Sequence, residues 1–380
     1  SLALGDQAQA LQMNATAVGA MSVAEGESST ASGALSVAKG VESSALGFQS
    51  MADADYSNAI GGSSYAGAMG ANAIGTGATA LGETSNAIGF GSVATGMDAV
   101  ALGTSSYASG VNAVAMGTSS NASGLYAVAM GAGSSAAADV SVAINTGTTE
   151  GIWTGARPGV DASASGGVAM GAAASIGADA TGGLALGLMA TVAGGAYQGV
   201  AIGTGSYVGD AQGIAIGGFG ARVLADGSYE LRPTVAMGIG AIALGLGSET
   251  FNDNATALGA FSTVVAENAV AIGANSLADR DNALSAGSAG NERQITNVAA
   301  GTAATDAVNK GQLDTVAAAV GAVASKAVGY DDASKGRATL AGANGTVIAN
   351  VAAGALSATS SEAVNGSQLF DTNSRVTVVE

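Results

Sequence analysis

The stretch AVALGTSSYASGVNAVAMG, residues 99–117, decides the fold because it contains one short phrase twice. Each copy reads large apolar residue, alanine, large apolar residue, glycine, and the two final glycines stand fourteen residues apart. Fourteen residues are two heptads of a helical repeat, but they also suit one turn of a β-solenoid. The rest of the chain decides between these two structures.

Glycines continue this spacing along most of the chain. An unbroken series of fourteen-residue steps runs from Gly5 to Gly131, and Asn145 occupies the next position. The series starts again at Gly171 and once more at Gly245. An interior glycine costs an α-helix about 1 kcal/mol relative to alanine, so a helix carrying one or two in every fourteen residues does not form.

The apolar residues between the glycines alternate with a period of two, as in Val114–Ala115–Met116. This period is typical of a β-strand, so each fourteen-residue unit predicts one coil with two short strands and two turns. Glycine ends a strand where the turn requires a positive φ. We expect Ala115 and its equivalents to fill a thin interior. Val114 and Met116 then point outward, where another copy of the chain is the simplest packing partner.

Composition excludes several classes of function. The 380 residues include 61 Gly, 2 Pro, no Cys and no His, so disulfides, thiolate metal sites and histidine chemistry are absent. A net charge of −17 argues against nucleic acid as a partner. No catalytic constellation is evident, and the glycine-rich runs do not lead from a strand into a helix as a dinucleotide site requires. We therefore expect no enzyme activity, no cofactor and no metal.

Two insertions, at about 146–166 and 219–234, interrupt the glycine series. The segment ADGSYEL (225–231) in the second predicts a hairpin turn between short strands. Insertions leave a solenoid as loops, often on its binding face, and Trp, Tyr and Arg are enriched at binding hot spots. Ligand contacts are therefore expected from Trp153, Arg157, Arg222, Tyr229 and Arg232. The alternative is that the loops pack on a neighbouring subunit.

The sequence changes character at residue 291, where the glycine period stops. Apolar residues then recur at steps of three and four, which predicts a coiled-coil seam at Leu313, Val316, Val320, Val323 and Ala327. Thr305 and Asp306 precede this helix and are suitable capping residues.

The end of the chain nearly repeats this motif. ITNVAAG (295–301) returns as IANVAAG (348–354), and DAVNKGQL (306–313) returns as EAVNGSQL (362–369) with three more residues between the halves. Between the copies, ATLAGANGTVIA indicates a small β element that turns at Asn344–Gly345. The predicted order is a β-roll head at 1–290, a neck at 291–313, a coiled coil at 314–328, a small β stalk domain at 329–347, a second, longer neck at 348–369 and the start of another coiled coil at 370–380.

These motifs together resemble the trimeric autotransporter adhesins of Gram-negative bacteria, with a head, neck and stalk like those of the Yersinia adhesin. AVAMGTSSNASG (113–124) is similar to their head repeat, and ITNVAAGTAATDAVNKGQL (295–313) is similar to their neck. The resemblance implies a homotrimer of left-handed parallel β-rolls on a coiled-coil stalk, and an outer-membrane β-barrel anchor outside this fragment. Glu362 departs from the family's usual Asp. The resemblance assigns neck and trimer roles to Ile295, Asn297, Val298, Asp306, Val308, Asn309, Leu313, Ile348, Asn350, Val351, Val364, Asn365 and Leu369.

The resemblance implies a cell-surface adhesin that attaches a Gram-negative bacterium to host or environmental surfaces. The partners would be extracellular-matrix proteins or cell-surface receptors, bound by many weak non-covalent contacts. The alternative is a structural spacer, or a fibre that associates with other copies of itself in autoagglutination or biofilm. Loss of ligand binding on deletion of 146–166 would favour the first hypothesis.

Overall fold

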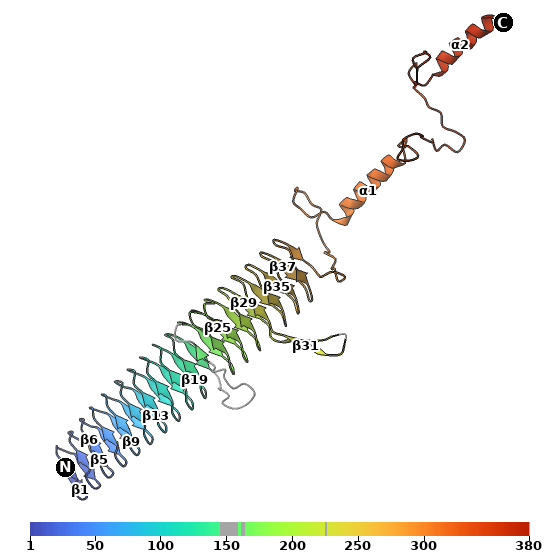
Figure 1. Ribbon diagram of the computed structural model, residues 1–380. Helices are drawn as coiled ribbons and strands as arrows, with labels where there is room; N and C mark the ends of the chain where they lie inside the picture. Colours follow the sequence, from blue (N-terminus) through green and yellow to red (C-terminus); the bar gives the residue numbers. More distant parts are fainter. Residues whose placement is uncertain (145–158, 161–163, 225, 380) are drawn as a thin grey trace. The chain divides into compact units, whose positions relative to one another are not determined.

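The computed structural model describes residues 1–144, 159–160, 164–224 and 226–379 (Figure 1). The chain forms two compact units, Ser1–Gln294 and Ile295–Glu380. The first is a parallel β-solenoid of about nineteen coils. Each regular coil contributes one three-residue strand to a sheet that we call sheet A, and one two-residue strand to a second sheet, sheet B. The parallel β-roll predicted from the fourteen-residue period is thereby confirmed.

Between the two ends of the roll, each described strand of sheets A and B pairs in parallel with its equivalents in the coils before and after it, for example Val100 with Val114 and Val114 with Val128. The strands of sheet A are β1 (Leu2–Leu4), β3 (Thr16–Val18), β5 (Thr30–Ser32), β7 (Ser44–Leu46), β9 (Asn58–Ile60), β11 (Asn72–Ile74), β13 (Asn86–Ile88), β15 (Val100–Leu102), β17 (Val114–Met116), β19 (Val128–Met130), β21 (Val142–Ile144), β23 (Val168–Met170), β25 (Leu184–Leu186), β27 (Val200–Ile202), β29 (Ile214–Ile216), β33 (Ile242–Leu244), β35 (Thr256–Leu258), β37 (Val270–Ile272) and β39 (Leu284–Ser285). Those of sheet B are β2 (Gln9–Ala10), β4 (Val23–Ala24), β6 (Val37–Ala38), β8 (Met51–Ala52), β10 (Tyr65–Ala66), β12 (Thr79–Ala80), β14 (Val93–Ala94), β16 (Tyr107–Ala108), β18 (Asn121–Ala122), β20 (Ser135–Ala136), β22 (Gly159–Val160), β24 (Ser175–Ile176), β26 (Thr191–Val192), β28 (Tyr207–Val208), β32 (Val235–Ala236), β34 (Glu249–Thr250), β36 (Thr263–Val264) and β38 (Leu277–Ala278).

The interior of the roll contains small side chains. Ala101 and Ala115 are fully buried there, as the alternation predicts. Serines share the interior, which the sequence analysis did not foresee. The Ser106 hydroxyl donates to the Gly103 carbonyl, and the Ser120 hydroxyl donates to the Gly117 carbonyl, both at 2.9 Å. A buried hydroxyl is tolerated only with a partner, and the turn carbonyl three residues earlier supplies one.

One glycine recurs in every regular coil, and a second stands half a coil later in some of them, as at Gly96, Gly110 and Gly124, whereas Ala54 and Ala68 take this position in other coils. Gly103 adopts φ +133°, and a Cβ there would lie 2.7 Å from the carbonyl oxygen of Gly117 in the next coil. The positive φ expected at the strand end is therefore present. Gly110, half a coil later, is required by contact alone, because a Cβ there would lie 1.8 Å from the Gly124 oxygen. Where it occurs, the second glycine leaves room for the backbone of the next coil.

The first and third residues of each three-residue strand point away from the interior, and we call this outer surface of sheet A face A. Val114 and Met116 are half-buried there, and Leu102 and Met130 are 39% and 37% exposed. These large side chains lie outside the roll, as the alternation predicts. In one chain nothing covers them completely.

Coils between β23 and β27 are longer, with sixteen residues separating Val168 from Leu184. Their interior contains Ile176 and Val192, both buried, where most regular coils have alanine. The next coil has Val208 buried at the same position. A Cβ on Gly199 would lie 2.9 Å from Val192 Cγ1, so glycine here leaves the space that the branched side chain fills. The small residue at Gly199 compensates for the large side chain at Val192, so the volume of the interior is conserved.

The last coil is closed by the chain that follows it. The Arg293 guanidinium donates through Nη1 to Ser276 Oγ at 2.9 Å and through Nη2 to the carbonyl of Ala274 at 2.5 Å. The backbone N–H of Arg293 also donates to the carbonyl of Ala286 at 3.1 Å. These bonds occupy polar groups at the end of the roll, where no further coil pairs with them.

The second unit contains helices α1 (Lys310–Ala324) and α2 (Gly366–Val379). Asn309 caps α1 by accepting from the N–H of Gln312, so the expected cap at Thr305–Asp306 is wrong. Asp306 instead accepts from the N–H groups of Thr302 and Ala303, both at 2.8 Å, and closes the turn before the helix. A carboxylate at that distance from the first helical turn does not reach its free N–H groups.

The segment 329–347, where we expected a small β domain, contains within one chain an isolated bridge between Ala343 and Gly345. A short strand needs a neighbouring strand for its backbone groups. The small β domain therefore stays a prediction.

Candidate binding surface on the inserted hairpin

The second insertion forms an antiparallel hairpin of β30 (Gly220–Val223) and β31 (Tyr229–Arg232). The hairpin predicted from ADGSYEL is confirmed, with Arg222 opposite Glu230 and Val223 opposite Tyr229. Asp226 stabilises the turn by accepting from the hydroxyl of Ser228 at 2.6 Å and from its N–H at 2.9 Å. These hydrogen bonds lower the pKa of Asp226 from its usual value.

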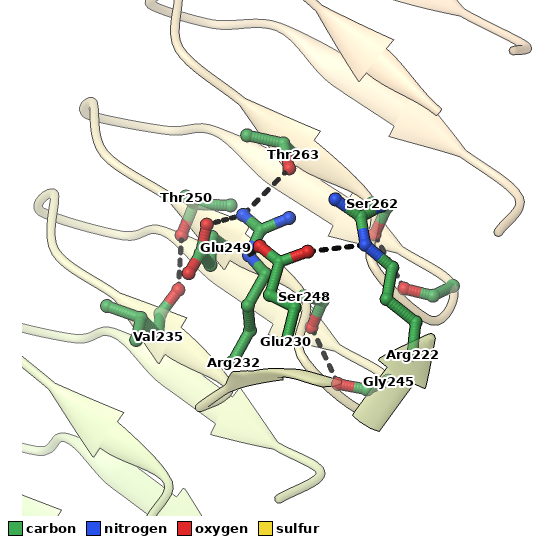
Figure 2. A network of polar contacts seen from close by, with 11 residues as sticks. Arg222, Glu230, Arg232, Val235, Gly245, Ser248, Glu249, Thr250, Ser262 and Thr263 are labelled. Atoms are coloured by element: carbon green, nitrogen blue, oxygen red, sulfur yellow. Dashed lines mark hydrogen bonds and ion pairs between the residues drawn. The ribbon is translucent and has the colours of Figure 1, made fainter. Parts of the chain in front are cut away.

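The inner face of the hairpin is ionic and is directed at the roll (Figure 2). The Arg232 guanidinium forms an ion pair with Glu249 of β34 and donates to Thr263 Oγ1 of β36 at 3.3 Å. Its Nε lies 3.8 Å from Glu230 Oε1. Burial lowers the pKa of Arg232, whose side chain is 18% exposed, yet a guanidinium remains protonated in proteins. Arg232 therefore connects the hairpin to two successive coils.

Arg222 makes a second connection. Its Nε forms an ion pair with Glu230, and its guanidinium carbon lies 5.3 Å from the ring centroid of Phe261, within cation–π distance. Gly220 approaches the same ring, since a Cβ there would lie 2.7 Å from it. These contacts hold the hairpin against the coils that follow β32.

The outer face of the hairpin is apolar. Val223 is 63% exposed, Tyr229 75% and Leu231 65%. An exposed hairpin usually turns its polar side to water, and this one turns its polar side to the roll. Exposed groups of apolar side chains mark interaction sites. We call Val223, Tyr229 and Leu231 the hairpin patch.

The structure thus separates the three predicted hairpin residues. Arg222 and Arg232 both form ion pairs with Glu230, so their charges have partners within the same chain. Tyr229 lies on the opposite face, beside residues that the sequence analysis did not name. The period-two alternation of GARV and YELR is the signal that assigns these residues to two faces. Trp153 and Arg157 of the first insertion lie outside the described residues.

Both necks contain the same hydrogen bonds. Asn309 Nδ2 donates to the carbonyl of Val298 at 3.1 Å, and Asn365 Nδ2 donates to that of Val351 at 3.0 Å. Two glutamines that the sequence analysis did not single out reach back to a glycine. Gln312 binds the N–H and C=O of Gly301 at 2.9 and 3.0 Å, and Gln368 does the same at Gly354, at 2.9 and 2.6 Å.

The other neck residues are of two kinds: asparagines with a left-handed backbone conformation, and apolar residues whose side chains are exposed. Asn297 and Asn350 have left-handed φ of 61° and 63°, a conformation that Asn tolerates. Glu362 accepts from the N–H of Ala355 at 2.8 Å, and its longer side chain suits the longer second neck. More than half of each apolar neck side chain is exposed in one chain, at Ile295, Val308, Leu313, Ile348, Val364 and Leu369.

The part of the chain that the structure describes contains no group of three or more acidic, histidine or cysteine side chains able to hold a metal ion. Its helices are all too short or too polar to cross a membrane.

Two family models match the chain. The head domain repeat of YadA matches residues 1–20, 12–36, 38–64, 73–96, 80–106, 108–134, 122–144, 236–262 and 265–288. The coiled stalk of trimeric autotransporter adhesins matches residues 294–334 and 347–379. The chain belongs to the trimeric autotransporter adhesins. Membership implies a homotrimer, the state after which the family is named.

Similar proteins come from two organisms. The trimeric autotransporter adhesin AtaA of Acinetobacter sp. strain Tol 5 is 50% identical over 93 residues, which are 23% of this chain and 2% of AtaA. The crystal structure of the collagen-binding domain of the Yersinia adhesin YadA is 24% identical, covers 59% of this chain and 86% of its own, and has a TM-score of 0.32. The C-terminal stalk of AtaA, fused to GCN4 adaptors, is 47% identical, covers 24% and 29%, and has a TM-score of 0.19. The adhesin thus spans about 2% of the curated relative it matches.

Proposed function

We propose that this adhesin acts at the bacterial cell surface and attaches a Gram-negative cell to extracellular-matrix proteins or cell-surface receptors. Three copies of each binding surface in one homotrimer raise avidity without any new contact. The net charge of −17 gives no general attraction to acidic cell surfaces, so binding depends on local contacts.

The observation that supports a defined ligand surface is the orientation of the inserted hairpin. Its charged side chains face the roll, where Arg232 pairs with Glu249, and the hairpin patch remains exposed to solvent. A surface fixed before the ligand arrives loses less entropy on binding. Tyr229 is the proposed ligand contact, while Arg222 and Arg232 serve the ligand by holding the hairpin. Trp153 and Arg157 are proposed contacts in the first insertion.

The test compares the full chain with the double variant Tyr229→Ser, Leu231→Ser. Binding to a panel of immobilised matrix proteins and to host cells is expected to fall at least about tenfold, the usual effect of losing hot-spot side chains. Leu81→Ser is the matched control, because Leu81 is also exposed, at 44%, on a regular coil. Arg232→Met is expected to weaken the same binding by loosening the hairpin.

Unchanged binding by the double variant, with the trimer intact, would remove the hairpin from the ligand surface. Loss of autoagglutination in place of ligand binding would support the alternative, a fibre that associates with other copies of itself. Both assays use the same purified proteins, so the two functions are separated directly.

A further inference from the structure

Face A carries one short polar run on an otherwise repetitive surface. Asn58, Asn72 and Asn86 occupy the same position in three consecutive strands, β9, β11 and β13. Asn58 Nδ2 donates to Asn72 Oδ1 at 2.8 Å, and Asn72 Nδ2 donates to Asn86 Oδ1 at 3.0 Å. We call these three residues the Asn ladder. All three are half-buried in the single chain.

The ladder ends abruptly. The next strands of sheet A have valine at the same position, namely Val100, Val114 and Val128, and the preceding strands have the hydroxyl residues Thr30 and Ser44. The third residue stays large and apolar across the boundary between Asn86 and Val100, as Ile74, Ile88 and Leu102, and it is a serine in β5, at Ser32. At this boundary the first position therefore distinguishes the coils, and the third position does not.

Face A is the surface that another copy of the chain would cover. None of the outward residues in the described strands of sheet A is charged, although the chain has 39 charged residues, 11 basic and 28 acidic. Glu249 is the one charged residue among the outward positions of the described strands of sheet B, and it pairs with Arg232 of the hairpin. A long uncharged face on a chain of net charge −17 is the face through which copies approach without repulsion. The homotrimer implied by family membership supplies these copies.

An interface made of repeated coils allows the copies to align in more than one axial register. Consecutive coils are alike and are about 4.8 Å apart, the spacing of neighbouring strands. If one copy slides by one coil, its apolar third positions still meet apolar third positions. Within the chain Asn86 Oδ1 accepts from Asn72 and one Asn86 N–H donates to the Thr84 carbonyl at 3.1 Å. The Asn ladder does not tolerate the change, because the second N–H of Asn86 then faces a valine equivalent to Val100. An amide buried without a partner is costly, and a single buried Asn sets the register of coiled coils for this reason.

We propose that the Asn ladder marks the axial register of the copies, with the amides of each copy meeting the same amides of its neighbours across face A. Each amide oxygen has two lone pairs, and Asn72 Oδ1 accepts one bond within its own chain. A second lone pair remains on this oxygen for another copy. Both N–H groups of Asn58 and of Asn72 donate within the chain, so Asn86, at the end of the ladder, supplies the N–H that another copy accepts. The proposal concerns assembly and does not depend on ligand binding.

The experiment asks whether chains choose partners with a matching ladder. In the full chain, Ser44→Asn with Asn86→Val moves the ladder by one coil, to positions 44, 58 and 72. Native and shifted chains carry different tags, are unfolded together and refolded together, and the trimers are sorted by mass. We expect the ratio of mixed to unmixed trimers to fall about tenfold below random mixing, the effect of roughly one unpaired buried amide.

The matched control is Thr79→Val, which also replaces a polar strand residue by valine, on sheet B of the same coil as Asn72. Chains with this change are expected to mix at random with native chains. Shifted chains alone must form trimers of normal thermal stability, which shows that the two substitutions are accepted. Random mixing of native with shifted chains would then overturn the proposal.

Discussion

The roll and the stalk unit differ in how far a single chain completes them. In the roll, alanine and serine interiors are fully buried and the glycines fit against the next coil. In the described part of the unit from Ile295 onward, no side chain is buried, and the apolar seam of α1 is open to water, with Val316 at 59% and Val323 at 67% exposure. One chain therefore suffices for the interior of the roll, and the stalk helices need other chains for theirs.

The largest expected effect is a loss of stability of the roll, from a substitution that leaves the stalk unit unchanged. Gly110→Ala places a methyl group against the backbone of the next coil and is expected to destabilise the roll by about 3 kcal/mol, at the upper end for overpacking. Urea denaturation followed by circular dichroism measures the loss. Gly77→Ser is the control, since Gly77 has φ +67° with open space around it, and should cost only about 1 kcal/mol. Equal losses would show that close contact between coils is not the constraint.

A smaller effect is expected from the stalk. Leu313→Asp removes an apolar seam residue and should weaken assembly by about 2 kcal/mol per chain, the transfer energy of one leucine. Analytical ultracentrifugation should detect dissociation while the strand signal of the roll persists. Ala318→Asp lies on α1 off the seam and should leave assembly unchanged. Unfolding of the roll along with the stalk would contradict the division between the two units.

The smallest effect concerns one turn of the first neck. Hydrogen bonds from the N–H groups of Ala303 and Thr302 lower the pKa of Asp306 from its usual value. A carboxyl whose folded pKa is depressed stabilises the fold above its unfolded pKa and loses that contribution as pH falls through the folded pKa. The protection of the Ala303 amide against hydrogen exchange, relative to the intrinsic exchange rate at each pH, should therefore fall below about pH 4. In Asp306→Asn the exchange rate should be raised already at neutral pH and lose this acid step.

The same difference explains what the sequence could predict. The period of glycines and the Val–Ala–Met alternation follow from backbone geometry inside one chain, so the coil and its alanine interior were predictable. The hairpin turn followed from its Asp-Gly pair. The buried serines were missed because a hydroxyl is accepted only where a turn carbonyl lies within reach, as at Ser120 and Gly117, and that contact is visible only in three dimensions.

The candidate site was harder to predict than the coil. Residue type predicts Arg222 and Arg232 as ligand contacts, but their partners on the roll, Phe261 and Glu249, lie seventeen or more residues further along the chain. Stacking of coils brings them together, and residue type alone contains no such information. In the neck, the roles of Gln312 and Gln368 depend likewise on a carbonyl eleven or fourteen residues earlier.

The small interior of the regular coils has a consequence for how such a molecule changes length. Alanine and glycine lose no side-chain rotamer freedom on folding, and each regular coil contacts only its two neighbours. Copying one fourteen-residue segment would therefore lengthen the rod by about 4.8 Å without repacking anything else. The distance along the roll between the hairpin and Gln294 would stay the same if the copy were made before β29, and would grow by one step if it were made after β32.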